Sequence, residues 1–237
     1  MSHIGTTHEK SLHRQLKLIF AGNDGHTEVE TAGFVADGVN ADGQYIEVQT
    51  RSFAPLRKKA KELAALGGLK IVYPVAVVKY LDVFDAAGGQ EPRKKSTRPG
   101  NVWDLFGELI YAPELPLIPG VEIELALVEV SEERVMDGKG SRRRKGLSIH
   151  DRKLLALRER ICLKSPCDYL RFVPFAKGEE FTAGIFAKKA RIRPRLANKT
   201  LHVLMALGIV ERMGKLGKAY VYRVIVSART KKWKKRP

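Results

Sequence analysis

The amino-acid sequence predicts an α/β domain followed by a winged-helix domain. Before residue 85 the pattern runs helix, three short strands, helix and apolar strand, and after residue 179 it runs two helices and a hairpin. The chain has 237 residues, 44% of them hydrophobic, enough for one large core or two modest ones. We therefore expect a first domain over 1–135, a basic linker over 136–147, a winged-helix domain over 148–228 and a basic tail over 229–237.

The first domain is expected to begin with an amphipathic helix over 7–21. Leu12 and Leu16 lie at helical spacing, Thr7 suits the cap, and Gly22 suits the end of the helix. The period then changes to that of strands, interrupted by glycines and an Asn-Ala-Asp-Gly turn. Three short strands are predicted, at 25–31, 33–40 and 44–50.

A second helix and a long strand are predicted next. Ser52 is the expected cap, Pro55 fits the first turn, and Gly67 is the expected stop. Residues 70–84 form a valine-rich apolar run, which is typical of a strand buried on both faces. A polar loop over 86–100, a helix over 101–111 and a strand over 121–130 complete the domain.

The second domain is expected to be helical at its start. The linker before it carries Arg142, Arg143, Arg144 and Lys145 in a row. Four helices are predicted, at 149–162, 165–173, 179–190 and 193–207, the last with Pro194 in its first turn and Gly208 at its end. A hairpin follows, so the order is that of a winged helix-turn-helix.

Charge is distributed unevenly along the chain, whose formal net charge is +17. Residues 1–133 hold 14 basic and 19 acidic side chains, whereas residues 134–237 hold 29 basic and 7 acidic ones. Such a basic half favours a polyanionic partner, because each phosphate that a lysine or arginine neutralises releases counterions. We expect DNA, with RNA as an alternative. A solvated basic face or an anionic membrane surface would also carry such charge, but no amphipathic membrane helix accompanies it.

Several classes of protein are not expected. No apolar run approaches the roughly 20 residues that a bilayer span needs, and the N-terminal sequence does not resemble a secretory signal. Cys162 and Cys167 are the only cysteines, too few for a disulfide framework. The sequence contains no glycine-rich phosphate-binding loop with a lysine, so nucleotide hydrolysis is not expected. We expect a soluble protein of the cytoplasm, associated with the nucleoid.

Two registers are available to the central hairpin. A three-residue loop over 41–43, with Gly43 in the left-handed conformation, places Asp37 directly opposite Glu47 and leaves an apolar set on the other face. A two-residue Asp-Gly turn shifts the pairing by one and mixes polar with apolar residues on both faces. We therefore favour the first register.

The favoured register suggests a metal site. Two facing carboxylates repel one another unless a cation compensates them, and oxygen ligands suit Mg²⁺ or Mn²⁺. Such an ion can polarise a phosphate and activate water, which Gln49 on the same face would orient. Glu28 and Glu30 on the preceding strand are alternative ligands, and ordinary solvent-facing acids are the alternative to any metal site.

Asp37, followed after a hairpin by Glu47-Val48-Gln49 and then by a helix and an apolar strand, resembles the PD-(D/E)XK nuclease superfamily over about residues 7–85. The resemblance implies a restriction-endonuclease-like mixed sheet flanked by helices. It also implies that Asp37, Glu47 and the Val48 carbonyl bind Mg²⁺ and that Gln49 fills the lysine position. Glu9 would be an accessory acid. Glutamine replaces the usual lysine and Ala36 the usual proline, so an inactive, DNA-binding descendant is the alternative.

Candidate nucleic-acid contacts lie in the basic half. The expected recognition helix directs Leu201, Leu204 and Met205 to the core, which leaves its polar residues outside. The candidate contacts are Arg195, Asn198, Lys199 and His202 on this helix, Lys215 and Lys218 at the wing, and Arg142, Arg143, Arg144 and Lys145 in the linker. A winged helix used for protein contacts is the alternative.

Together these features predict a Mg²⁺-dependent DNA endonuclease that holds duplex DNA with a basic winged helix. One site would cut one strand, so double-strand cleavage would need a homodimer or two encounters. A catalytically inactive DNA-binding regulator and an RNA-processing factor are the alternatives.

Overall fold

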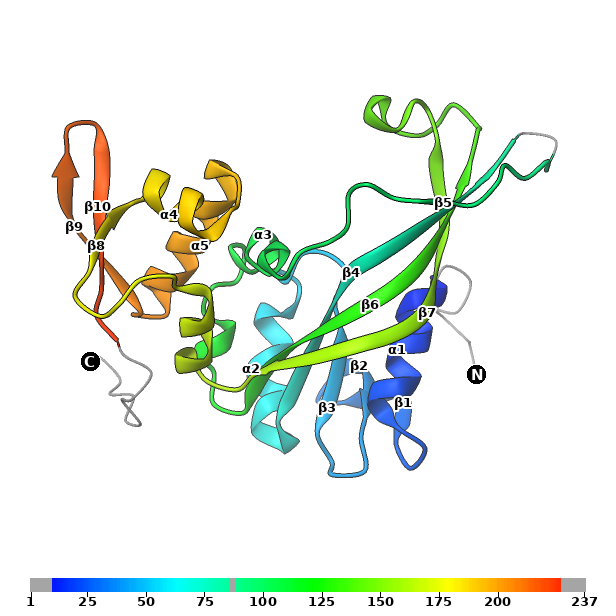
Figure 1. The fold of residues 1–237 in the computed structure, drawn as a ribbon. Helices are drawn as coiled ribbons and strands as arrows, with labels where there is room; N and C mark the ends of the chain where they lie inside the picture. The colour runs from blue at the N-terminus through cyan, green and yellow to red at the C-terminus, as the bar shows by residue number, and fades with distance from the viewer. Residues whose placement is uncertain (1–9, 86–87, 227–237) are drawn as a thin grey trace. The chain divides into compact units, whose positions relative to one another are not determined.

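The computed structural model describes residues 10–85 and 88–226 (Figure 1). The chain divides into two compact units. The first comprises Met1–Thr50, Lys70–Val102 and Glu124–Ile161, and the second comprises Arg51–Leu69, Trp103–Ile123 and Cys162–Pro237. The protein is therefore of mixed α/β class, with a large sheet in the first unit and a small one in the second.

A seven-stranded sheet dominates the first unit, with the order β1-β2-β3-β4-β6-β7 and the short β5 beside β4. The helix and strands are α1 (Ser11–Ala21), β1 (His26–Thr31), β2 (Phe34–Val39), β3 (Tyr45–Val48), β4 (Leu69–Phe84), β5 (Lys94–Lys95), β6 (Val121–Val135) and β7 (Ser148–Leu163). The predicted order of helix, three strands, helix and strand up to residue 84 is confirmed.

The core of the first unit lies between α1 and the sheet. Leu12 and Leu16 lie at the predicted helical spacing and form one buried stripe with Phe20. The sheet side of this core consists of Ile46, Val48, Val72, Ala126, Val128 and Val130. The helix ends where Gly22 takes a positive φ of 78°, which a glycine adopts without strain.

The favoured hairpin register is confirmed. Gly38 pairs with Ile46 and Val39 with Tyr45, and Gly43 closes the loop with φ 78°. This pairing buries Ala36, Ile46 and Val48 on one side, as the alternation predicted. The same register carries Asp37 to the position opposite Glu47.

The helix predicted over 149–162 is wrong, because these residues belong to strand β7. β7 lies next to β6 in the sheet, so the basic segment 136–147 joins two neighbouring strands, and Arg142–Arg144 form one 3-10 turn there. β7 therefore belongs to the first unit up to Ile161, and the second unit combines the residues from Cys162 onward with Arg51–Leu69 and Trp103–Ile123, which the sequence had assigned to the first domain.

The second unit contains a three-stranded antiparallel sheet in the order β8-β10-β9. Its elements are α2 (Leu56–Gly67), α3 (Leu105–Leu109), the 3-10 segment Pro166–Phe172, β8 (Glu180–Thr182), α4 (Ala183–Ala190), α5 (Pro194–Ala206), β9 (Val210–Leu216) and β10 (Ala219–Val224). The predicted helix over 179–190 therefore begins only at Ala183, where Thr182 caps it by accepting a hydrogen bond from the Ile185 N–H.

Two smaller expectations in the second unit are corrected. Ser52 does not cap α2, since its hydroxyl accepts a hydrogen bond from the Ala54 N–H and Pro55 immediately precedes the helix. The segment 165–173 forms 3-10 turns rather than an α-helix. Among the described helices, none combines the length and the apolar character that a membrane crossing requires.

Candidate functional site

Three acidic residues form a row across β1, β2 and β3. Thr27 pairs with Gly38 and Val29 with Ala36, so Glu28 stands opposite Asp37, and the β2–β3 register places Glu47 on the other side of Asp37. Glu47 is 1% exposed, whereas Glu28 is exposed and has a positive φ of 55°. The row therefore runs from solvent into the first unit.

Hydrogen bonds tie Asp37 to strand β3. Its Oδ2 accepts the Val48 N–H at 2.7 Å, and its own N–H lies 3.3 Å from Glu47 Oε1. The Asp37 carboxylate thus contacts the backbone of β3, and the Glu47 carboxylate contacts the backbone of β2. The two carboxylates are therefore anchored at the point where the β2–β3 ladder ends.

Helix α1 brings two basic side chains to this row. His13 Nε2 lies 3.2 Å from Asp37 Oδ2 and 2.9 Å from the Val48 carbonyl oxygen. Lys17, which is 4% exposed, forms an ion pair with Glu28 and places Nζ 3.8 Å from Asp37 Oδ1. His13 and Lys17 are one helical turn apart, so α1 presents both to the same edge of the sheet.

These contacts keep Asp37 ionised. Burial alone raises the pKa of the Asp37 carboxyl. The hydrogen bond and charge of His13, the Val48 N–H and the charge of Lys17 outweigh that effect, so the pKa of Asp37 lies below its usual value. Asp37 is therefore a carboxylate whose charge is balanced from within the chain.

The residues do not fit Mg²⁺ as they are arranged. The predicted ion would contact Asp37 and the Val48 carbonyl, yet His13 Nε2 lies within hydrogen-bonding distance of both. Across the described ranges, no three His, Cys, Asp or Glu side chains are grouped so as to hold a metal ion. An ion at this place would require His13 to move.

The other predicted members of this site have different positions. Gln49 follows β3, is partly buried, and donates its backbone N–H to the Val72 carbonyl at 2.8 Å. Glu30 is exposed on β1. Glu9, the expected accessory acid, lies outside the described residues. Of the alternatives weighed in the sequence, Glu28 is the one that joins Asp37 through Lys17.

A surface of the second unit contains five of the ten predicted nucleic-acid contacts. Arg195, Asn198 and His202 are exposed at three- and four-residue spacing on α5, so they share one face of the helix. Their helix is fixed from behind by Ala197, Leu201 and Leu204, which are fully buried. We call this surface, together with the exposed Lys215 and Lys218 of the hairpin, the α5–hairpin surface.

Lys199 contributes differently from its neighbours. Its Nζ donates to the Gly107 carbonyl at 2.9 Å and lies 5.3 Å from the centre of the Tyr111 ring. Lys199 therefore fixes α5 against α3. The remaining linker candidates, Arg142, Arg143 and Lys145, are exposed, whereas Arg144 donates to the Leu147 carbonyl at 3.2 Å.

Sequence reasoning missed four side chains. His13 and Lys17 lie on the predicted helix, but only the packing of α1 on the sheet brings them to Asp37. Arg212 and Tyr220 belong to the hairpin, where Arg212 and Lys215 lie 4.5 Å and 5.0 Å from the centre of the Tyr220 ring. An aromatic residue interleaved with basic ones in a predicted wing would have been the signal for this pair.

Comparison with known proteins yields a family but no activity. A family model described as a domain of unknown function (DUF8091) matches residues 10–164. An uncharacterized protein of Treponema pallidum (strain Nichols) is 32% identical over 152 residues, which are 64% of this chain and 61% of that protein. The chain thus matches about three fifths of that relative's length. No solved structure matches. The family match covers the acidic row and ends before β8.

Proposed function

The chain belongs to the family described as a domain of unknown function (DUF8091), and we propose that it is a duplex DNA-binding protein whose C-terminal unit acts as a winged helix. The order β8, α4, α5, β9 and β10, with β8 paired to β10 and β10 to β9, is that of a winged helix-turn-helix. In this interpretation α5 is the recognition helix and the β9–β10 hairpin is the wing.

The observation that carries the proposal is the exposed polar stripe of α5. Arg195 and Asn198 have the side chains that make paired hydrogen bonds with guanine and adenine in a major groove. Lys215 and Lys218 on the wing suit the flanking phosphates. A helix fits the wide major groove of B-form DNA but not the deep, narrow groove of A-form RNA, so DNA is favoured over RNA.

Two acidic residues of the second unit form ion pairs outside the α5–hairpin surface. Glu179 lies 3.5 Å from Lys189, and Glu180 pairs with Arg223 through Arg223 Nη2 at 2.5 Å. These acids therefore neutralise basic residues outside the α5–hairpin surface. A DNA partner is in keeping with a cytoplasmic, nucleoid-associated location.

Fluorescence anisotropy with a labelled 20-base-pair duplex tests the proposal. The Arg195→Ala/Lys215→Ala variant should bind at least about tenfold more weakly, because each base or phosphate contact contributes roughly 1–3 kcal/mol. The Lys189→Ala/Arg223→Ala variant removes the same charge from paired positions and should change affinity by less than about threefold. Equal losses in the two variants would show that net charge alone determines binding, and would contradict the proposal.

A second candidate is the metal-dependent DNA endonuclease that the sequence predicts. The observation that favours it is the row of Glu28, Asp37 and Glu47 beside the buried Lys17, and it requires His13 to leave Asp37 before an ion can bind there. Supercoiled plasmid incubated with Mg²⁺ or Mn²⁺ tests it. Nicking by the parent that both Asp37→Ala and Glu47→Ala abolish would support the nuclease. Because one site cuts one strand, paired cuts would need a homodimer or two encounters. Intact plasmid in all samples, with unchanged duplex binding, would contradict the nuclease and support DNA binding without cleavage.

A further inference from the structure

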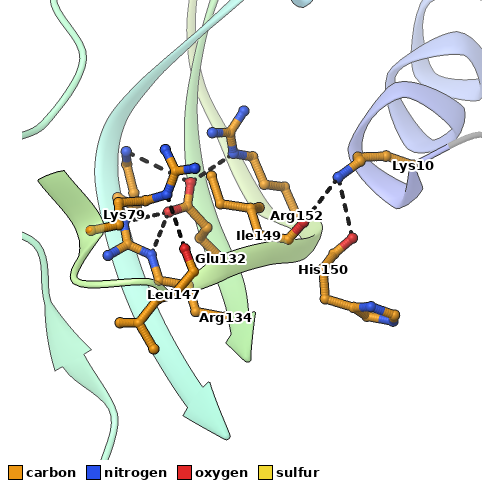
Figure 2. A network of polar contacts seen from close by, with 9 residues as sticks. Lys10, Lys79, Glu132, Arg134, Leu147, Ile149, His150 and Arg152 are labelled. Carbon is orange, nitrogen blue, oxygen red and sulfur yellow. Dashed lines mark hydrogen bonds and ion pairs between the residues drawn. The ribbon is translucent and has the colours of Figure 1, made fainter. Parts of the chain in front are cut away.

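A buried carboxylate in the first unit is surrounded by three cations. Glu132 on β6 is fully buried, and Lys79 of β4, Arg134 of β6 and Arg152 of β7 converge on it, as Figure 2 shows. We call these four residues the Glu132 cluster. Glu132 is ionised, because hydrogen bonds from Arg134 and Arg152 and the charges of Arg152 and Lys79 outweigh the rise in its pKa that burial causes.

The two arginines are held rigidly. Arg134 donates Nε and Nη2 to Glu132 Oε1 at 2.8 Å and 2.5 Å, and Arg152 donates Nε to Oε2 at 2.7 Å. Lys79 Nζ lies 3.9 Å from Oε2. Both oxygens of a single carboxylate thus orient two guanidinium groups, which limits the entropy that either would lose on binding a ligand.

The Glu132 cluster carries an excess of positive charge. Three cations face one carboxylate. Glu133, next to Glu132 in the sequence, pairs with Lys153, and Asp82, three residues after Lys79, pairs with Arg93 and Ser131. By contrast, Arg158 and Glu129 further along β6 and β7 form a one-to-one pair. Glu124, also on β6, is contacted by two cations, Lys70 and Arg160, so three cations on one carboxylate distinguish the Glu132 cluster from both of these sites.

Donors remain available on these arginines. Within the described residues, Arg152 makes no hydrogen bond through its two terminal nitrogens, nor Arg134 through Nη1. The Arg152 side chain is 37% exposed and that of Arg134 is 16% exposed. Leu147, three residues after the turn Arg142–Arg144, accepts a hydrogen bond from Arg144 and lies beside the cluster in Figure 2. Solvent-facing guanidinium nitrogens fixed by a buried acid suit the planar, paired recognition of phosphate oxygens.

We infer that the Glu132 cluster is a binding site for a phosphate group, in which Glu132 positions Arg152 and Arg134 and these arginines contact the ligand. The phosphate would come either from a nucleic-acid backbone, in which case the site deepens the proposed DNA-binding function, or from a small phosphorylated molecule. The exposed Arg142, Arg143 and Lys145, in the segment that joins β6 to β7, favour the backbone, because they could contact further phosphates.

Titration of the full chain with inorganic phosphate at constant ionic strength, followed by the arginine Nε–H signals in NMR spectra, tests the site. The Arg152 and Arg134 signals should shift and saturate, whereas that of Arg158 should not. Arg152→Ala should weaken phosphate binding about tenfold or more. Arg158→Ala, which removes the same charge from the same strand, should leave it unchanged. Equal, unsaturated shifts at every exposed arginine would overturn the inference.

Glu132→Gln separates positioning from simple charge. This substitution adds one positive charge to the cluster, so attraction by net charge alone predicts tighter phosphate binding. Positioning by the carboxylate predicts weaker binding, by about fivefold or more, and tighter binding would contradict our inference. If this variant does not fold, the comparison of Arg152→Lys with the parent replaces it, because lysine keeps the charge but loses the paired donors, and an unchanged affinity would then be the contradicting result.

Duplex DNA identifies the source of the phosphate. If Arg152→Ala weakens both phosphate binding and duplex binding, the site contacts a nucleic-acid backbone. If it weakens phosphate binding alone, the ligand is a small phosphorylated molecule. Failure of the proposed winged helix would give a different result. Duplex binding would be unchanged in Arg195→Ala/Lys215→Ala, while the phosphate titration would still saturate.

Discussion

At the residue scale, the hydroxyl of Tyr169 is the most unusual polar group in the second unit. Its side chain is fully buried among Phe106 and Phe172, whose ring centres lie 6.4 Å from its own. Within the described residues the hydroxyl has no hydrogen-bond partner, and burial, with smaller effects of Asp168 and Cys162, raises the pKa of Tyr169 well above its usual value. Removing an unpartnered buried hydroxyl relieves a desolvation cost.

Tyr169→Phe should therefore leave the free energy of unfolding unchanged or raise it by up to about 1 kcal/mol. Tyr45→Phe is the matched control, because the Tyr45 hydroxyl lies 3.2 Å from Thr31 Oγ1, and it should lower stability by about 1 kcal/mol. Urea unfolding followed by circular dichroism measures both. A loss of more than about 1 kcal/mol in Tyr169→Phe would mean that its hydroxyl has a partner in solution.

Individual residues differ in how far the sequence predicts their roles. Alternation places Asp37 opposite Glu47, because a slip of one residue would expose the apolar set of β2 and β3. His13 and Lys17 could not be placed in that way. Their contact with Asp37 depends on how α1 packs on strands that follow it in the sequence, and the periodicity within α1 does not specify this packing.

At the element scale, α1 is stable because it is packed. Its eleven residues are too few for an isolated helix, and no side chain caps its N-terminus. Its stability therefore depends on the buried stripe of Leu12, Leu16 and Phe20, while Leu18 on the outer face is 58% exposed. Burial, and not helix propensity, should determine which leucine matters.

Leu16→Ala should lower the free energy of unfolding of the chain by about 2–5 kcal/mol, because it leaves a cavity in the core. Leu18→Ala removes the same atoms from the exposed face and should change stability by less than about 0.5 kcal/mol. Chemical denaturation compares the two variants. Similar losses in both would show that α1 does not pack as described.

Strand β7 shows where sequence reasoning failed for a whole element. Its segment LLALRER is rich in leucine, alanine, arginine and glutamate, all good helix formers, so local propensity favours a helix. Pairing with β6 overrides that preference. Arg152, Arg158 and Arg160 each form an ion pair with a glutamate of β6, namely Glu132, Glu129 and Glu124. These partners lie 20 or more positions away, beyond the reach of a helix pattern.

At the scale of the whole molecule, the acidic and basic halves of the chain are less separate than the sequence suggests. The split between residues 133 and 134 separates the acids of β6 from the basic residues of β7 that neutralise them. Part of the positive excess in the second half is therefore internal to the sheet. The exposed basic residues that a polyanion could contact include those of the α5–hairpin surface and of the turn Arg142–Arg144.

Acid should destabilise the first unit. The pKa values of Asp82, Glu124 and Glu132 are lowered by hydrogen bonds and nearby cations, which in each case outweigh the effect of burial. A lowered pKa in the folded state adds stability at neutral pH, and this stability is lost as pH falls below the unfolded value of about 4. We expect the free energy of unfolding to fall steadily between about pH 5 and pH 3.

Glu132→Gln provides the control for this pH dependence. The variant should be less stable than the parent at pH 7, because two arginines lose their charged partner, but it should lose less stability on acidification. Thermal unfolding at a series of pH values measures the difference. Parallel pH profiles for the variant and the parent would contradict the role of Glu132.

We propose that the α5–hairpin surface binds a DNA backbone, and the salt dependence of duplex binding tests this most directly. For the parent, log Kobs should fall linearly with log salt concentration, and Lys215→Ala/Lys218→Ala should make the slope shallower by about 0.9 for each lost phosphate contact. An identical slope in parent and variant would contradict the claim, because the wing lysines would then neutralise no phosphates.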